Sequence, residues 1–247
     1  MQWSLILYAV LLICHFILYS TVSNPISLAW FGDATQWIGL FLGAMFIGRI
    51  AKNASREDFP KWMYVTFGVF VLLLGQTFLT YSELLLKRLA YGSISDVFWF
   101  LGFCSIWVGL IQLAKPYVSG KEFVRWMLIG AALYAVVLGI LWADLMGTTR
   151  TTYLKFLDLT YSFMEIGMFI LALIITLHAK PRLPWKLATI SLAIYLATDT
   201  LAVYYSDLNN PVYRYLDIPY FIGVCAWWLL GATYNTRQQI STERQRV

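Results

Sequence analysis

The stretch Tyr215-Leu216-Asp217-Ile218-Pro219-Tyr220-Phe221-Ile222-Gly223 contains a spacing that recurs along the chain. An Asp is followed by an aromatic residue three positions later and by a Gly six positions later. Because an α-helix has 3.6 residues per turn, these three residues lie near one face of a helix. A long apolar run begins inside the stretch, so this Asp–aromatic–Gly motif is expected to open a hydrophobic helix.

Three earlier segments carry the motif with decreasing fidelity. The four motif Asp residues are separated by 63, 62 and 59 positions. A near-constant period of this length predicts an internal repeat. The earlier segments are Asp96–Gly102 with its aromatic at Trp99, Asp33–Gly39 with its aromatic one position later at Trp37, and Asp158–Tyr161, in which Met164 replaces the Gly.

The composition is that of a membrane protein. Of the 247 residues 60% are apolar and 13% are charged, and the mean hydropathy is +0.67. Soluble domains carry about 25% charged residues. We therefore expect an all-α integral membrane protein, with one bundle over residues 1–235 and a short polar tail over 236–247. The net charge of +5 comes from basic residues in short loops, which argues against a nucleic-acid partner.

Eight apolar stretches are long enough to cross a bilayer as helices, which takes about 20 residues. The connections between them are short, so neighbouring helices are predicted to be antiparallel. The eight stretches are 3–22, 28–50, 61–83, 94–115, 124–145, 156–179, 185–206 and 213–235.

Lys and Arg are distributed unequally between the two sets of loops. Thirteen of the 18 fall on the side that holds both termini, and cytoplasmic loops are the ones enriched in these residues. Both termini are therefore predicted to be cytoplasmic. The bundle is predicted to consist of four helical hairpins in one orientation, over about 1–60, 61–123, 124–183 and 184–235.

The motif Asp residues are predicted to lie at the extracytoplasmic face, where each opens the returning helix of its hairpin. Asp33 is the exception and is expected about a turn inside its helix, because the apolar run starts before it and Arg49 follows only 16 residues later. Two interpretations stay open. A carboxylate in the first turn can accept from free backbone N–H groups and cap the helix. Alternatively, the four faces converge on a cavity with an acidic and aromatic rim. The rim residues are Asp33, Asp96, Asp158 and Asp217, with Trp99, Tyr161 and Tyr220 as the aromatic candidates.

Polar side chains deeper in a bilayer are costly and often functional. His15, Gln76 and Asp199 occupy related places in outgoing helices, and Asp199 is the strongest functional candidate among them. For Asp199 the alternative is a hydrogen bond to a neighbouring Thr or Tyr, and His15 is interpreted as a packing residue. Glu165, about two turns into its helix, is either functional or structural, and Asp144 is expected at an interface.

Several kinds of site lack their sequence patterns. No cluster of His, Cys and carboxylate residues has the spacing of a metal site, and the sequence contains neither a nucleophile elbow nor a phosphate-binding Gly-rich loop. No Lys lies at a helix centre, which argues against a retinal Schiff base. The cofactor is therefore unknown, and a bound lipid or pigment stays open.

Two hairpin segments carry a resemblance to a known class. Leu141-Trp142-Ala143-Asp144 is followed by Phe156-Leu157-Asp158-Leu159-Thr160-Tyr161, and Ala197-Thr198-Asp199-Thr200-Leu201 is followed by the stretch at 215–223. This pattern resembles the multi-helix sensor regions that precede bacterial diguanylate cyclase (GGDEF) and histidine kinase domains. The resemblance implies a signalling function in a bacterial inner membrane. Since only thirteen residues follow Tyr234, we expect the output to come from a separate partner.

A second, weaker likeness is to the eight-helix lysoplasmalogenase-like (YhhN) family. Thr198-Asp199-Thr200-Leu201-Ala202 is similar to a late Ser-Asp stretch of that family. The early Gly-Asp motif of the family has no counterpart, since Gly75-Gln76 stands in its place. The likeness implies an intramembrane hydrolase whose catalytic residues would be Asp199, Glu165 and Asp144.

The leading hypothesis from the sequence is a non-enzymatic membrane module. It binds a small apolar ligand, a pigment or partner helices, and it senses or scaffolds. The alternatives are an accessory subunit of a larger membrane complex and the intramembrane hydrolase. A transporter ranks last, because the sequence shows no pair of broken helices. The expected partners are membrane lipid and other membrane proteins.

Overall fold

The computed structural model describes residues 2–22, 24–82, 93–147, 151–180, 182–204 and 215–234. This part of the chain is all-helical and has no strand. Its helices are α1 (Gln2–Thr21), α2 (Pro25–Asn53), α3 (Phe59–Thr80), α4 (Ile94–Ala114) with the short 3₁₀ turn η2 (Lys115–Tyr117), α5 (Gly120–Gly147), α6 (Thr152–His178), α7 (Arg182–Tyr204) and α9 (Asp217–Val224), which residues 226–234 follow as a further helical segment.

The prediction of an all-α membrane protein is confirmed in its coarse form. Among the described residues six helices, α1 to α6, are long and apolar enough to cross a membrane. Three of them begin three or four residues before the predicted starts, and local capping explains two of these differences. Ser119 and Glu122 hydrogen-bond to each other's backbone N–H at the start of α5, and the Thr151 hydroxyl accepts from the Leu154 N–H at the start of α6. The third, α2, begins at Pro25, a residue favoured in a first turn.

The last helix differs from the single span expected over 213–235. It is interrupted at Cys225, whose φ of −76° and ψ of 2° depart from α-helical values. Helix α9 therefore covers eight residues before the interruption, and a second segment continues from 226 to 234. Pro219 lies in the first turn of α9, where its missing N–H removes no hydrogen bond within the helix.

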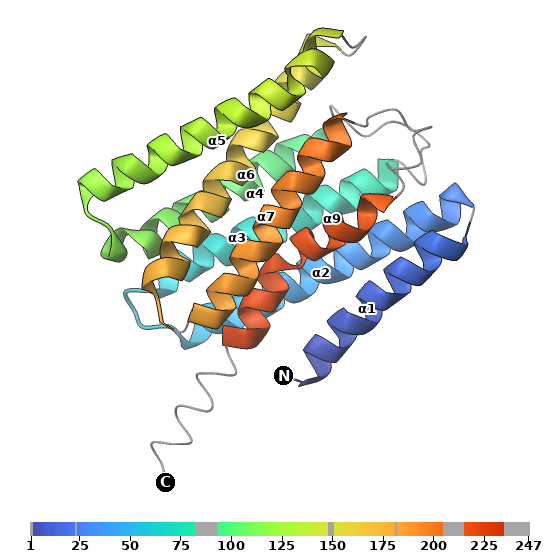
Figure 1. Cartoon of the computed structure of the whole chain (residues 1–247). Coiled ribbons are helices and arrows are strands. Elements are labelled where there is room, and N and C mark those ends of the chain that lie inside the picture. The colour runs from blue at the N-terminus through green and yellow to red at the C-terminus, as the bar shows by residue number, and fades with distance from the viewer. Residues whose placement is uncertain are drawn as a thin grey trace.

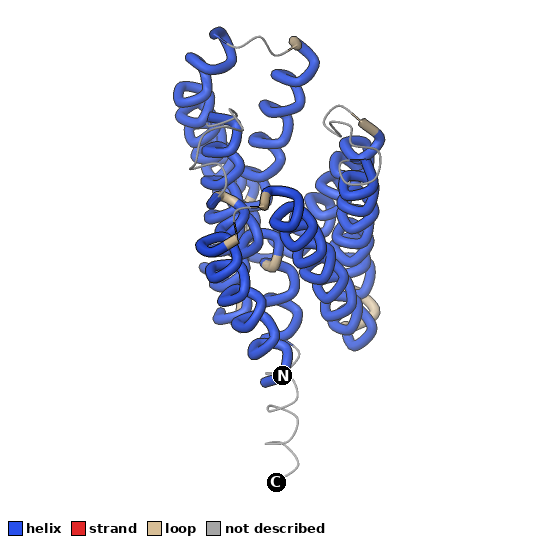
Figure 2. The backbone as a smooth tube through the Cα atoms, turned by 90° about the vertical axis from the view of Figure 1, so that its right-hand side faces the viewer, coloured by secondary structure: helices blue, strands red, loops and turns tan. Residues whose placement is uncertain are grey.

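The helices run side by side along one direction (Figure 1), and Figure 2 shows the same bundle of helices turned by 90°. Helices α3 and α4 cross closely at Gly68 and Gly102, where a Cβ on Gly68 would come within 2.7 Å of the Gly102 carbonyl oxygen. Helix α6 packs on α4 and α7, and α9 packs on α7, α2 and α1. The first and last parts of the chain therefore meet.

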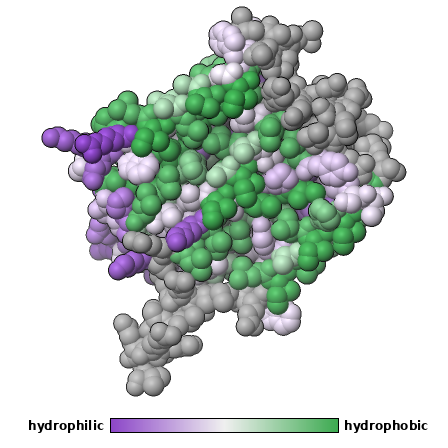
Figure 3. All heavy atoms as spheres, in the orientation of Figure 1, coloured by the Kyte–Doolittle hydropathy of each residue, from purple (hydrophilic) through white to green (hydrophobic). Residues whose placement is uncertain are grey.

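Helices α1 and α5 lie at opposite flanks (Figure 1) and expose apolar side chains such as Trp3, Phe16 and Leu128. Apolar residues cover much of the face seen in Figure 3, and hydrophilic residues gather at the end where α5 begins. An apolar belt beside a polar end is the surface that a bilayer requires.

Candidate functional site

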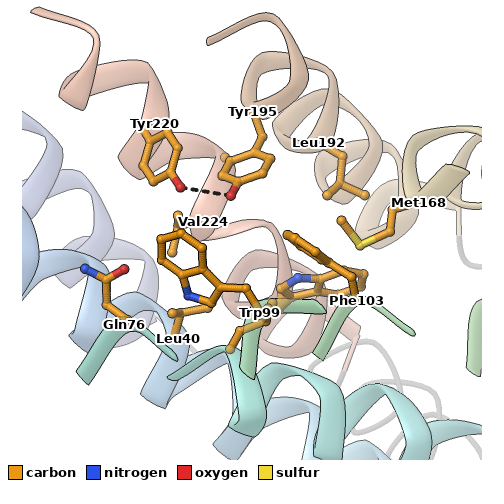
Figure 4. A pocket seen from close by; sticks show the side chains of 12 residues that line it. Leu40, Gln76, Trp99, Phe103, Met168, Leu192, Tyr195, Tyr220 and Val224 are labelled. Atoms are coloured by element: carbon orange, nitrogen blue, oxygen red, sulfur yellow. Dashed lines mark hydrogen bonds between the residues drawn. The ribbon is translucent and has the colours of Figure 1, made fainter. Parts of the chain in front are cut away.

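A small cavity lies inside the bundle, between α2, α3, α4, α6, α7 and α9 (Figure 4). Its volume is about 40 Å³, which is room for a few water molecules. The lining is aromatic and aliphatic with a few polar groups. The lining residues are Leu40, Leu72, Gln76, Trp99, Phe103, Met168, Leu192, Tyr195, Tyr220, Gly223, Val224 and Trp227.

Two tyrosines from neighbouring helices form one wall of the cavity. The hydroxyl oxygens of Tyr195 on α7 and Tyr220 on α9 are 2.9 Å apart and share a hydrogen bond, and the ring centroids are 4.9 Å apart (Figure 4). Gly223 permits this approach, because a Cβ there would overlap Cβ of Tyr195. The Gly of the motif thus gives space to an aromatic residue of the preceding helix.

Trp99 of α4 forms the opposite part of the lining. Its indole lies on Gly75 of α3, where a Cβ would overlap the indole ring. Tyr161 of α6 supports Trp99 from outside the lining, with a ring-centroid distance of 6.0 Å and an interplanar angle of 70°. Gln76 lines the cavity and donates from Nε2 to Asp33 Oδ1 at 3.1 Å. Two motif aromatics, Trp99 and Tyr220, therefore reach one cavity from different hairpins.

Two carboxyl groups, those of Glu165 and Asp199, lie beside the tyrosine wall, and the carboxyl group of Asp158 lies near Asp199. Glu165 and Asp158 are 2% and 1% exposed and stand two turns apart on α6, and Asp199 of α7 is half-buried. Asp199 interacts electrostatically with both of them. Both Tyr195 and Tyr220 in turn interact electrostatically with Glu165 and Asp199. The structure therefore brings Glu165 and Asp199 together next to the cavity, although neither lines it.

Glu165 is placed deeper than its sequence suggested. Helix α6 begins at Thr152, so Glu165 lies near the middle of the helix rather than two turns from its start. Its Oε2 atom is buried and has no hydrogen-bond partner among the described residues. An unsatisfied carboxylate oxygen at this depth is costly, which makes Glu165 the most unusual polar group of the site.

His15 does not line the cavity and packs among aromatic side chains. Its ring stacks on Phe221 and Tyr19, with centroid distances of 4.5 and 5.8 Å, and it is fully buried. Nε2 lies 3.1 Å from the hydroxyl oxygen of Thr35, and Nδ1 lies 3.1 Å from the carbonyl oxygen of Leu11. Both nitrogens are therefore satisfied locally. The side chain of Asp144, a candidate of the hydrolase hypothesis, lies outside the described residues.

The capping interpretation holds for one motif Asp. Asp96 accepts from the Ser93 backbone N–H at 2.8 Å in a capping box, and its other oxygen accepts from the Tyr161 hydroxyl at 2.5 Å. Asp217 opens α9 without capping it and accepts from the Tyr19 hydroxyl of α1. The helix-start position was wrong for Asp158, because α6 begins about two turns before it, whereas Asp33 was expected inside its helix and lies about two turns into α2. An early Pro and an early cap extend those two helices outward.

Some of the residues predicted for a cavity or ligand site line this cavity. Gln76, Trp99 and Tyr220 line the cavity, whereas Asp199, Glu165, Tyr161 and His15 do not. Tyr195 was missed, although it stands four residues before Asp199 and therefore on the same helical face. Trp227 and Phe103 were missed because apolar aromatics in an apolar helix give no signal.

Neither a metal site nor similarity to a known protein assigns a function to the cavity. In the described ranges no group of three or more His, Cys, Asp or Glu side chains is placed to hold a metal ion. No protein-family profile, curated protein sequence or solved structure matches the chain.

Proposed function

We propose that the chain is a multi-pass integral membrane protein that binds a small ligand in the cavity between Trp99, Gln76, Tyr195 and Tyr220 and passes the signal to a separate partner protein. The observation that carries the proposal is a cavity inside the helix bundle whose wall bears hydroxyl, amide and indole groups. Convergent polar groups in a mostly apolar pocket are typical of ligand sites. The resemblance to bacterial sensor regions supports the signalling part.

The cavity changes the expected kind of ligand. A space of about 40 Å³ is much smaller than the 300–1,000 Å³ typical of pockets for drug-sized molecules. A pigment does not fit without movement of the helices. A small molecule, or one group of a larger molecule such as a lipid, matches the space and the polar wall better.

The test is native mass spectrometry of the full chain purified in detergent. Leu192→Phe enlarges a buried lining residue and is expected to displace a co-purifying small molecule. Ile190→Phe makes a similar change on the same helix at a side chain that is 58% exposed, and it should leave the bound molecule in place. If the purified chain carries no small molecule, or if both variants retain it equally, the cavity is not the binding site.

The membrane topology is part of the proposal. Eight spans in four hairpins of one orientation, with cytoplasmic termini in a bacterial inner membrane, are supported by the six apolar helices and by the distribution of Lys and Arg. Fusions of alkaline phosphatase or green fluorescent protein after residue 60, 123, 183 or 247 test this arrangement. Fluorescence at every one of these positions is expected, and phosphatase activity at any of them contradicts the topology.

An intramembrane hydrolase is the second candidate, because Glu165 and Asp199 interact near the bundle interior. Two carboxyl groups in contact with water could act as acid and base. The weaker family likeness names a lysophospholipid with a vinyl ether bond as the substrate to test. Hydrolysis by the purified chain that is lost in Asp199→Asn would establish this activity, and absence of turnover in the unaltered protein would exclude it for this substrate.

A further inference from the structure

The pair Glu165 and Asp199 places two carboxyl groups inside the bundle. Glu165 is 2% exposed, and its Oε2 atom has no hydrogen-bond partner in the described part of the chain. Asp199 forms no hydrogen bond or ion pair with a described residue, and the two carboxyl groups interact electrostatically with each other. Two ionised carboxylates repel each other in a medium of low dielectric constant, and a cation beside them relieves this repulsion.

The described residues do not supply that positive charge. The ion pairs among them are those of Lys61 with Glu57 and Asp58, at the start of α3. On α6 and α7 the basic residues Lys155, Lys180, Arg182 and Lys186 stand near the helix ends, whereas Glu165 stands near the middle. No basic side chain in the described ranges therefore forms an ion pair with Glu165 or Asp199.

The surroundings of the pair suit a cation. Asp199 stands one turn from Tyr195 on α7, and Glu165 stands about one turn from Met168 on α6. Tyr195 and Met168 both line the cavity, as does Tyr220, so the carboxyl groups lie one turn beyond its lining. The aromatic rings of Trp99, Phe103 and Trp227 also line the cavity. Figure 4 labels Trp99 and Phe103 among them. Aromatic faces attract ammonium groups, by about 0.5 kcal/mol when exposed and about 2 kcal/mol or more when desolvated. The volume of about 40 Å³ limits the group to one close to the size of a primary ammonium.

We propose that Glu165 and Asp199, together with the Tyr195–Tyr220 wall, bind a primary ammonium group of a small organic cation. The proposal rests on the proposed ligand-binding function and names the ligand class. The carboxylates neutralise the ammonium charge, and the tyrosine hydroxyls accept its N–H hydrogens. Anions are rejected by the same charges, and neutral ligands leave the carboxylate charges without compensation.

The experiment titrates the full chain in detergent micelles with methylammonium chloride and follows tryptophan fluorescence, because Trp99 and Trp227 line the cavity. Sodium chloride at the same ionic strength and methanol, a neutral molecule of similar size, are the comparison solutes. A saturable change is expected with methylammonium alone. An equal change with sodium chloride or with methanol would overturn the ammonium assignment, as would the absence of a saturable change.

Variants locate the binding site. Glu165→Gln and Asp199→Asn, which keep side-chain volume, should each weaken methylammonium binding by about tenfold or more. Asp58→Asn removes one negative charge at an exposed loop and should leave the affinity unchanged. Unchanged affinity in both Glu165→Gln and Asp199→Asn would overturn the site. If Leu192→Phe displaces a neutral molecule while methylammonium fails to bind, the ligand-binding function stands and the ammonium class falls.

Discussion

The second and fourth hairpins use one motif to build the same backbone packing with different side-chain partners. In both, the motif Gly lies against the preceding helix, Gly102 against Leu72 of α3 and Gly223 against Tyr195 of α7. In both, the motif aromatic reaches the cavity. The motif Asp differs, because Asp96 caps its own helix whereas Asp217 is bound by Tyr19 of α1. The spacing thus determines where two helices touch, and the neighbouring helix determines what the carboxylate does.

The largest expected effect on stability distinguishes the carboxylate of Asp96 from that of Asp217. Asp96→Ala removes a cap and leaves the buried Tyr161 hydroxyl without its acceptor, for a loss of about 2–4 kcal/mol of unfolding free energy. Asp217→Ala should cost about 1 kcal/mol or less, because the Tyr19 hydroxyl keeps the carbonyl oxygen of Leu28 as an acceptor at 3.1 Å. Unfolding by dodecyl sulfate titration in mixed micelles measures both. Equal losses would contradict the distinction between the two hairpins.

The next effect tests the packing that the hairpins share. Gly223→Ala places a methyl group against Cα and Cβ of Tyr195, which cannot move without the backbone, and it should cost about 2–3 kcal/mol. Gly102→Ala meets the flexible end of Leu72 at 2.7 Å and the Gly68 carbonyl oxygen at 3.0 Å. Since the Leu72 side chain can move and the backbone contact is less severe than at Gly223, we expect a smaller loss of about 1–2 kcal/mol.

Gly139→Ala on α5 is the matched control for these two variants, because no atom lies within 4 Å of the added methyl group. Ala favours a helix interior over Gly by about 1 kcal/mol, so this variant should be neutral or slightly stabilised. The packing argument fails if Gly139→Ala loses as much stability as Gly223→Ala in the same titration.

The smallest expected effect concerns Asp58, in the connection between the first two hairpins and outside the membrane-spanning helices. The Lys61 ammonium donates to Asp58 at 2.7 Å and, by this hydrogen bond, lowers the pKa of the Asp58 carboxyl. A carboxyl group whose pKa is lowered in the folded state stabilises the protein above its unfolded pKa of about 3.9, and this contribution is lost as the pH falls through the folded pKa.

Because the Asp58 side chain is 48% exposed, the contribution should be only about 0.5 kcal/mol. The measurement compares thermal unfolding of the unaltered chain and of Asp58→Asn between pH 7 and pH 3. A stability difference at pH 7 that disappears at pH 3 is expected. A difference that stays constant across this range would show that the carboxylate charge plays no part.

Helix positions could be predicted from the sequence because an apolar run of fixed length is what a bilayer demands. The inner part of the site was predictable only where polarity or the repeat marked it, as for Gln76, Trp99 and Tyr220. Contacts between hairpins leave no pattern in the local sequence from which they could be predicted. The bond from Tyr19 to Asp217 joins residues 198 positions apart, and neither its partners nor the cavity beside Tyr195 follows from a period of about 60 residues.

The contact of α9 with α1 and α2 has a consequence for how the protein is made. Synthesis proceeds from the N-terminus, so Tyr19 enters the membrane long before Asp217 exists. During that interval α1 lacks one of the surfaces it packs on, and the tyrosine hydroxyl relies on the carbonyl oxygen of Leu28. The contacts of α9 with α1 and α2 can form only after the last hairpin is made. A chain stalled before residue 217 would therefore lack them.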